Sequence, residues 1–547
     1  MSKICLDEKS IFSKIIRSGR LICSFILLII LALIARLATA QNINSTPNTA
    51  QVVSPSISLL LSDVDGDQLN DATIENKDVK FIISSKTGSI SFYYLKGEKF
   101  EENLYPPQLV AYNYAFDKDS MKGFDIDTPY NSFASSSFTI EKESENDNEL
   151  IVRVTSNQTI TVDDNTPDYQ SISLTRRFII NKEGYSFKLE NSFSNLKEKL
   201  INLGNDVSGS FALTYGPGVF MEPYGPQSIL ALKNEDDFEN FTNVNSLNEK
   251  GSKAGSYCGI GIKDQYFCVM MESDQPLSIF GSESEVKSTD ARRKAMTTKL
   301  IKCSFPKFNL GAKETRNFNF TIYAGPLYHH ELQKINRAKI SDYGWLVKKM
   351  LEILRFFYSL IPNYGVAIIL LTLVVRLILY PLTLKQTKEM AKMQKIQPKV
   401  KALQDMYRDD PQKMNEEIMK LYTKNHVNPL GGCLPLLLQL PIIMALFNTF
   451  RNAVELRKAS FLWMSDLSKG DPYLILPITI AVLMHLQQSK ATTDPQQRQA
   501  MAFMPVMMLL FTFSLPSGLL VYWFASSVLG LLQQLQTNKL MASMKED

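Results

Sequence analysis

Hydrophobic positions follow one period in the first part of the chain and another after about residue 340. Between residues 76 and 340, apolar and polar residues alternate in short runs such as 79–84 and 177–180, with glycine-containing turns at 86–88 and 182–184. Alternation with period two, interrupted by such turns, is typical of antiparallel strands. Residues 76–340 are therefore predicted to form a large antiparallel β-sandwich.

After residue 340 the pattern becomes helical and much more apolar. Residues 341–360 include an amphipathic stretch suited to the membrane interface. Residues 362–384 contain a single charged residue, Arg376, and are long enough to span a bilayer. Four shorter apolar runs follow at 434–450, 473–487, 501–513 and 519–532. The pattern predicts a polytopic α-helical membrane bundle with five core helices in residues 361–536, and the short runs are expected to thin the bilayer.

Residues 1–40 carry a membrane-targeting pattern. Five basic residues precede the apolar run 21–35, and the small residues 38–40 follow it. This arrangement fits either a cleaved signal sequence or a retained N-terminal anchor helix, and in both cases the chain from residue 41 onward lies outside the cytoplasm.

Residues 41–75 are predicted to be a polar linker because they are rich in Asn, Ser, Thr and Asp. Their acidic residues Asp63, Asp65, Asp67, Asp71 and Glu75 have spacings that a calcium loop uses. The glycine is misplaced for an EF-hand, however, and Ile74 stands where a bidentate carboxylate is needed. A solvated acidic linker is therefore favoured over a metal site.

Charge is distributed unevenly between the two parts. Residues 41–340 carry 39 acidic and 31 basic side chains, whereas residues 341–547 carry 14 and 22. Within the second part, residues 385–428 carry 10 basic and 6 acidic side chains. The positive-inside rule places 385–428 and the amino terminus in the cytoplasm and residues 41–340 outside it. The short tail 537–547 is expected to be cytoplasmic.

Residues 385–428 also show apolar residues at intervals of three and four, which predicts an antiparallel helical hairpin. Two interpretations remain open, a solvated linker or a docking element for a cytoplasmic partner. The basic residues that would form the docking patch are Lys385, Lys388, Lys392, Lys395, Lys399 and Lys401.

Candidate chemistry is sparse. The six cysteines form no C-x-x-C pair, and no catalytic triad or phosphate loop is present, so no enzyme activity, cofactor or metal is expected. Cys258 and Cys268 either bridge neighbouring strands or, as is favoured, remain free thiols together with Cys303. The basic excess is flanked by apolar runs rather than by a polar aromatic face, which argues against a nucleic-acid substrate.

Arg376 is the most informative residue. It lies roughly 12 Å from the cytoplasmic end of its helix, where an uncompensated guanidinium costs from roughly 3 to above 10 kcal/mol. The other apolar runs contain no Asp or Glu to pair with it. We therefore expect a water-filled groove lined by Thr372, Gln439, Gln488, Tyr522 and Ser526. Two alternatives are that Arg376 donates to carbonyls freed by Pro435 and Pro441, or that it binds a transported anion.

Methionines are concentrated in the same part of the chain, with 14 of 21 after residue 385. Flexible methionine surfaces suit contact with many unrelated apolar segments, although ordinary packing explains most such residues. The candidate sliding surface for an apolar client consists of Met444, Met504, Met507 and Met508.

The sequences TLVVRLILYPLT (372–383), NPLGGCLP (428–435) and LQLPIIMAL (438–446), with Met504-Pro505 and Pro516-Ser517-Gly518, resemble the YidC membrane protein insertase family. The resemblance implies an inner-membrane protein with a periplasmic sandwich and a retained N-terminal helix. It also implies that Arg376 is the groove arginine and that Trp523 stands where the family often has a second tyrosine.

The resemblance further implies partners. Nascent membrane proteins would be received in a groove open to the cytoplasm and released into the lipid bilayer, alone or with the Sec translocon, and the 385–428 hairpin would meet the ribosome. A small-solute transporter is an alternative, but the halves of the chain show no internal symmetry. A membrane-tethered binding protein that acts through its sandwich is a third class.

Overall fold

The computed structural model describes residues 57–96, 102–105, 122–127, 137–156, 172–204, 209–216, 227–286 except 235 and 254, 296–341, 344–425 except 409, 434–489, and 507–543 except 510 and 514. The chain divides into two compact units, one formed by Val52–Asp342 and the other by Tyr343–Asp547 with Met1–Gln51. The choice between signal sequence and anchor helix for residues 1–40 falls outside the described residues.

The first unit, here called the β domain, is built almost entirely from strands. They are β1 (Ser58–Ser62), β2 (Asp71–Glu75), β3 (Val79–Ile83), β4 (Ile90–Leu95), β5 (Glu102–Tyr105), β6 (Lys122–Asp127), β7 (Phe138–Glu145), β8 (Glu149–Ser156), β9 (Ile172–Asn181), β10 (Ser186–Asn195), β11 (Ile201–Leu203), β12 (Ala212–Gly216), β13 (Ser228–Leu232), β14 (Phe238–Phe241), β15 (Tyr257–Lys263), β16 (Phe267–Val286), β17 (Met296–Ser304), β18 (Phe308–Leu310) and β19 (Thr315–Pro326). The helices α2 (Val244–Gly251) and α3 (His329–Lys334) and the 3-10 turn η2 (Ala338–Ser341) complete it.

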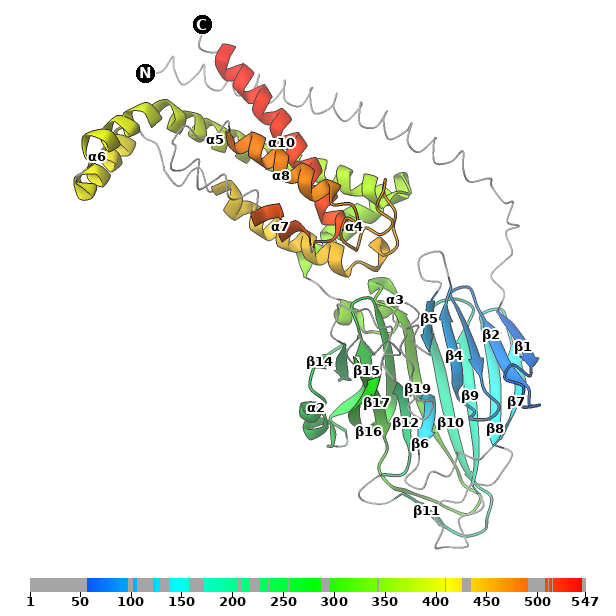
Figure 1. Ribbon diagram of the computed structural model, residues 1–547. Helices are drawn as coiled ribbons and strands as arrows, with labels where there is room; N and C mark the ends of the chain where they lie inside the picture. The colour runs from blue at the N-terminus through cyan, green and yellow to red at the C-terminus, as the bar shows by residue number, and fades with distance from the viewer. Residues whose placement is uncertain are drawn as a thin grey trace, which may run out of the picture. The chain divides into compact units, whose positions relative to one another are not determined.

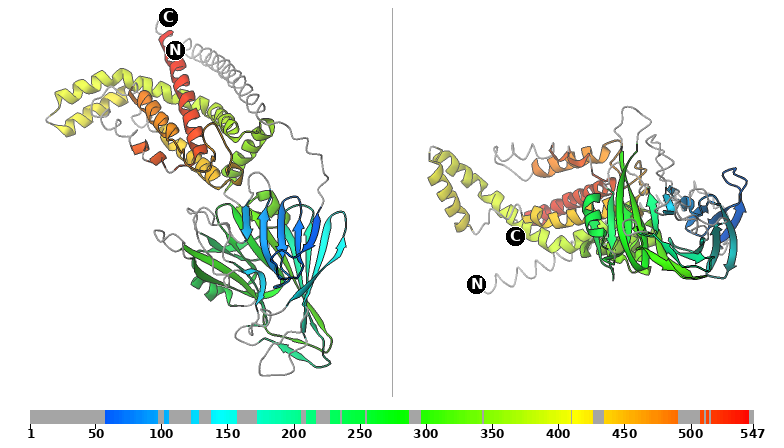
Figure 2. Two further views of the ribbon diagram at one scale, coloured as in Figure 1. Left: turned by 45° about the vertical axis from the view of Figure 1, so that its right-hand side comes forward. Right: turned by 90° about the horizontal axis from the view of Figure 1, so that it is seen from below.

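Two antiparallel sheets face each other in this domain. A five-stranded sheet has the order β1-β2-β3-β4-β5, and a larger sheet has the main path β14-β13-β15-β16-β19-β10-β9-β8-β7. Both ribbon views show the smaller sheet lying over the β7 end of the larger one (Figures 1 and 2). Phe81 of β3 stacks on Phe187 of β10 with ring centroids 5.7 Å apart, which places aromatic side chains of both inner faces in one core.

The hairpin of β9 and β10 illustrates why these residues form strands. Alternate side chains of β9 are buried, and the strand pairs with β10 from Phe187↔Ile180 to Asn195↔Ile172. Gly184 in the connecting turn has φ +94°, a conformation that glycine adopts without strain. This hairpin and its turn are as the sequence pattern predicts.

The predicted polar linker is wrong in its second half. Residues 58–62 and 71–75 form β1 and β2, which pair antiparallel from Ser58↔Glu75 to Ser62↔Asp71. Ala72 and Ile74 are fully buried, and the buried Asp71 carboxylate accepts from the Ser85 amide at 2.8 Å. The composition suggested a linker because polar residues dominate, whereas this buried face depends on contacts with distant strands.

The acidic residues Asp63, Asp65 and Asp67 lie in the turn between β1 and β2. Their carboxylates lie close together and are exposed, and Asp63 accepts from the Gly66 amide at 2.7 Å and the Gln68 amide at 3.0 Å. Such bonds stabilise a turn. The structure therefore gives these carboxylates a local structural role.

The predicted alternative of a Cys258–Cys268 bridge is also wrong. Cys268 faces Lys263 in the pairing of β15 with β16, whereas Gly259, beside Cys258, faces Glu272. This offset corresponds to about 15 Å along the strands, far beyond the roughly 7 Å Cα separation that a disulfide allows. Cys258, Cys268 and Cys303 are free thiols, and burial raises the pKa of Cys258 to about 11.

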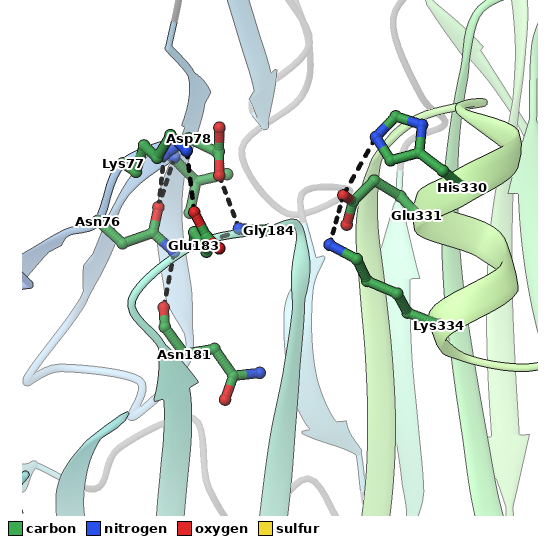
Figure 3. Close-up of polar contacts among 10 residues, drawn as sticks. Asn76, Lys77, Asp78, Asn181, Glu183, Gly184, His330, Glu331 and Lys334 are labelled. Atoms are coloured by element: carbon green, nitrogen blue, oxygen red, sulfur yellow. Dashed lines mark hydrogen bonds and ion pairs between the residues drawn. The ribbon is translucent and has the colours of Figure 1, made fainter. Parts of the chain in front are cut away.

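One end of the β domain carries a set of polar contacts around Asn76, in the turn between β2 and β3 (Figure 3). The buried Asn76 amide donates to Asn181 O at 2.9 Å, and its oxygen accepts from the Asp78 and Val79 amides at 2.8 Å. Beside it, exposed Lys77 pairs with Glu183 at 2.9 Å. Asn76 therefore joins the two sheets through bonds shielded from water, while Lys77 joins them through water-exposed groups.

Replacing Asn76 with alanine should lower the free energy of unfolding of the β domain by about 1–3 kcal/mol, because it leaves buried backbone groups without partners. Urea-dependent pulse proteolysis of the full chain in detergent, scored on fragments from residues 52–342, measures this. Lys77→Ala is the matched control and should leave stability nearly unchanged, because its ion pair is exposed. Equal losses in both variants would contradict the assignment.

The second unit, here called the helical body, contains α4 (Trp345–Leu360), α5 (Tyr364–Met406), α6 (Pro411–Lys424), α7 (Leu434–Asn452), the 3-10 turn η4 (Val454–Leu456), α8 (Ile475–Ser489) and α10 (Ser517–Ser543). Within its described residues, Tyr364–Thr383 is the one segment long and apolar enough to cross a membrane, and Ile475–Leu486 and Ser517–Gln533 are shorter apolar helical segments. Most of the predicted 501–513 run lies outside the described residues.

Helix α5 combines two predicted elements. It begins at the Asn363 cap, whose side chain accepts from the Val366 amide, and continues through Pro381 and Pro398 to Met406. The predicted boundary at residue 385 therefore falls inside one helix rather than at a turn. After it, Asp410 caps α6 by accepting from the Lys413 amide, and Pro411 occupies the first turn.

A common core holds the helical body together. Val347, Met350 and Leu354 of α4 pack with residues of α5, α7, α8 and α10 such as Leu371 and Leu446. The predicted amphipathic stretch is thus a helix with one buried face. Large apolar side chains on the other surfaces, including Ile378, Val482 and Phe511, are exposed, as expected for surfaces that contact lipid.

Candidate functional site around Arg376

The site is centred on Arg376, which projects from α5 toward α10. Among the described residues, its guanidinium donates hydrogen bonds to one residue, Ser526. Nε donates to the Ser526 hydroxyl at 3.0 Å, and Nη2 donates to the same hydroxyl at 2.7 Å and to the backbone carbonyl at 2.6 Å. Among the described residues, the acceptors are therefore both on Ser526 rather than a carbonyl freed by Pro441, and the carbonyl that Pro435 would free lies outside the described residues.

One of the three guanidinium nitrogens, Nη1, remains open for another acceptor. Nη1 has no hydrogen-bond partner among the described residues. It is also not one of the buried side-chain atoms that lack a partner, so it is not sealed off from an incoming acceptor. Arg376 itself is half-buried. Within the described chain no carboxylate forms an ion pair with it. The site therefore offers a cation with unused donors.

Three further predicted groove residues lie with Arg376. The Gln439 amide of α7 donates to the Tyr522 hydroxyl of α10 at 2.8 Å. The same hydroxyl interacts with Ser526 and with the charge of Arg376. Gln439, Tyr522, Ser526 and Arg376 thus form a polar connection across three helices that are otherwise mostly apolar. The sequence does not show that these four residues are neighbours, because they lie far apart along the chain and their helices come together only in the folded protein.

Thr372, Trp523 and Gln488 are the other residues expected near the groove. Thr372 is fully buried, and its hydroxyl donates to Ile368 O at 2.7 Å within its own helix. Because Thr372 has no exposed surface and its hydroxyl hydrogen is used within the helix, it does not line an open polar groove. Trp523 is half-buried and packs against the apolar core of the body. The Gln488 side chain lies outside the described residues.

The candidate client surface is only partly visible. Met444 and Met507 are exposed by 57% and 51%, and Met508 is half-buried. Met504 lies outside the described residues. The exposed pair presents flexible apolar side chains on α7 and in the segment before α10, as a surface for apolar helices requires.

The lysine patch lies on exposed positions of α5. Lys392, Lys395, Lys399 and Lys401 are exposed, whereas the side chains of Lys385 and Lys388 lie outside the described residues. The apolar seam between α5 and α6 buries Ile396 and Val400. The hairpin therefore buries two apolar residues of α5 and leaves its described lysines in solvent, whereas no residue of α6 is buried and Met406 and Met419 are exposed.

A further polar contact, which the sequence did not assign a role, ties α4 to the loop after α7. Arg355 forms an ion pair with the buried Glu455, and nearby Trp463 donates its ring N–H to Asp471 at 2.9 Å. Both acidic residues lie a few positions outside apolar runs in the sequence. That position is the sequence signal that could have marked them as candidates for polar contacts at the end of the helical body. They stabilise the loop at this end of the body.

An apolar helical body with a spanning helix, joined to a large β-sheet domain, defines a membrane protein with a substantial domain outside the lipid. Residues 104–354 match the family described as YidC periplasmic domain, and residues 356–545 match the family described as 60Kd inner membrane protein. A membrane protein insertase YidC from Campylobacter jejuni is 30% identical over 521 residues, covering 92% of this chain and 88% of that relative. The chain belongs to the YidC family of membrane protein insertases, inner-membrane proteins with a periplasmic domain.

Two further comparisons define the extent of the likeness. A membrane protein insertase YidC from Pseudoalteromonas atlantica is 46% identical over 222 residues, which cover 39% of this chain and 41% of that relative. This match is limited to less than half of either chain. A solved active YidC insertase with its first transmembrane domain resolved covers 87% of this chain and 94% of its own, at 19% identity and a TM-score of 0.38. That score is too low to support structural inference.

Proposed function

We propose that this insertase receives the polar segment of a nascent membrane protein at Arg376 and releases the client's apolar helix into lipid. The observation that carries the proposal is the half-buried guanidinium whose Nη1 has no partner among the described residues. A carboxylate of the client is the natural acceptor for those two N–H groups. Gln439, Tyr522 and Ser526 would keep the surroundings polar enough for a hydrated segment.

The mechanism is physical. A charged residue costs roughly 2.5–3.5 kcal/mol at the centre of a bilayer, so two or three charges block unaided crossing. A polar site inside the helical body shortens the apolar path that these charges must cross. The short apolar helices would thin the bilayer and shorten that path further. Burial of the client's own apolar helix in lipid then supplies the driving force without nucleotide.

The proposed arrangement in the membrane has five core helices, corresponding to α5 up to residue 384, α7, α8, the 501–513 run and α10, with the N-terminal segment as an additional anchor. The amino terminus and residues 385–428 would be cytoplasmic and residues 41–340 periplasmic. The exposed lysines of the hairpin, such as Lys395 and Lys399, would contact the ribosome or the Sec translocon. Met444, Met507 and Met508 would contact the departing client helix.

Arg376→Ala should lower insertion of clients whose translocated segment is acidic by about tenfold and leave clients with neutral segments near the wild-type rate. Purified full-length protein in liposomes, with protease protection of the two client types, measures this. Arg451→Ala removes an exposed arginine of the same body and is the control. Arg376→Lys keeps the charge but not the forked donor geometry, so intermediate insertion is expected. Unchanged insertion of every client by Arg376→Ala would remove the groove charge from the mechanism.

A further inference from the structure

A glycine lies directly against the guanidinium of Arg376. Gly530 is on α10, and a Cβ built at this position would lie 3.1 Å from Nη2, 3.4 Å from Nη1 and 3.5 Å from Cζ of Arg376. Contacts of 3.1 Å are closer than side chains normally tolerate, so an added methyl group requires the guanidinium to move. Glycine is otherwise the least favourable helix residue after proline, so its place in the middle of α10 calls for a packing reason.

The position of Gly530 follows from helix geometry. It is four residues after Ser526, and the carbonyl of residue 526 points toward the amide of residue 530 in an α-helix. Nη2 of Arg376 reaches that same carbonyl at 2.6 Å. A side chain at residue 530 would occupy space beside the guanidinium where it reaches the Ser526 carbonyl. The missing side chain therefore opens access to the carbonyl that accepts the bond.

We propose that Ser526 and Gly530 together form a seat on α10 that orients Arg376 toward its client, with Gly530 as a positioning residue. The seat uses Nε and Nη2, so the unpartnered Nη1 becomes the group presented to an acidic client segment. This inference rests on the proposed function of Arg376. An arginine side chain has many rotamers, and ordering it costs conformational entropy. If the seat fixes Arg376 before the client arrives, binding of the client no longer carries that entropy cost.

The seat predicts a graded response to side-chain size at residue 530. Gly530→Ala adds one methyl group, which a small shift of the guanidinium accommodates, so insertion of acidic clients should fall by no more than about twofold. Gly530→Val cannot be accommodated in this way and should reduce it by about five- to tenfold. Insertion of clients with neutral segments should stay near the wild-type rate in both variants. A general weakening of helix packing would lower both client types together.

The experiment measures initial insertion rates of one acidic and one neutral client into liposomes containing the full-length protein. Gly530→Val is tested alone and combined with Arg376→Ala. Ala525→Val, which places the same valine side chain at another half-buried position of α10, is the control. If the seat acts through Arg376, Gly530→Val should cause no further loss once Arg376 is alanine. Ser526→Ala removes only a hydroxyl and should lower acidic-client insertion by about two- to fivefold. This smaller change still tests the seat if the Gly530→Val protein does not fold.

The outcomes separate this inference from the proposal on which it rests. If Arg376→Ala alone leaves acidic clients unaffected, the proposed function of Arg376 fails. If Arg376→Ala lowers their insertion but Ser526→Ala and both Gly530 variants match wild type, the seat is wrong while the groove charge stands. An equal loss from Gly530→Val with and without Arg376 would also overturn the seat, because the glycine would then act through helix packing.

Discussion

Replacing Arg376 with glutamate should reverse the charge preference of the insertase. Clients with acidic translocated segments should lose at least about tenfold in insertion, because two like charges in a partly water-excluded site cost several kcal/mol. Clients with basic segments should gain, because the new carboxylate attracts them. The Ser526 hydroxyl, which accepts from Arg376 in the native site, is able to donate to the new carboxylate, so the substituted side chain keeps one local partner.

Three matched clients that differ only in the sign of the translocated charge provide the measurement, with initial rates taken at low and high salt. Added salt should reduce the difference between acidic and basic clients, because screening weakens interactions between hydrated charges. The neutral client reports general damage to the helical body. Equal losses for all three clients would mean that Arg376 supports the fold rather than client selection.

Replacing Arg176 with alanine should produce the largest loss of stability in the β domain, about 3–5 kcal/mol. Arg176 is 1% exposed and donates to Asn191 Oδ1 at 3.0 Å, to Gly88 O at 2.6 Å, to Ser89 Oγ at 2.8 Å and to Phe124 O at 2.7 Å. These acceptors belong to three other segments, so one side chain satisfies buried oxygens from each. Burial lowers the pKa of Arg176 to about 10, and the group remains protonated at neutral pH.

The adjacent Arg177 supplies the control. Its side chain is 32% exposed and pairs with Glu143 at 2.9 Å and Glu190 at 2.5 Å on the sheet surface. Arg177→Ala should therefore cost about 0–1 kcal/mol. Pulse proteolysis in urea of both full-length variants compares them directly. A loss for Arg176→Ala no larger than that for Arg177→Ala would show that its buried hydrogen bonds do not dominate the stability of this domain.

Local features of the fold were predictable wherever neighbouring residues determine them. The alternation of buried side chains in β9, the glycine turn before β10 and the Asp410 cap with Pro411 at the start of α6 each depend on a few adjacent residues. The predicted linker failed at β1 and β2 because polar composition does not report strand pairing, and β1 pairs with β2 while β2 pairs with β3. The favoured free thiols are confirmed, and the alternative Cys258–Cys268 bridge could be decided only by strand register, which determines which cysteines meet.

The site shows the same division. Arg376 stood out because a lone charge in an apolar helix is costly wherever that helix packs. The seat on α10 was not predictable in the same way. Ser526 is 150 residues away from Arg376 along the chain, and no spacing rule links the two. Thr372 shares a helix face with Arg376 by sequence spacing, yet its hydroxyl is bonded within α5.

The amino-acid sequence by itself determined the kinds of surface that this protein builds: strands with one apolar face, apolar helices, a basic hairpin and one isolated cation in a spanning segment. These follow from the hydrophobic period and from the cost of moving charge out of water, both of which are local properties. Only the tertiary structure decided which groups satisfy the buried ones, such as Ser526 for Arg376 and Gly88, Asn191 and Phe124 for Arg176. Those partners are chosen by the packing of segments far apart in the chain, because a hydrogen bond requires atoms within about 3 Å and sequence order does not set that distance.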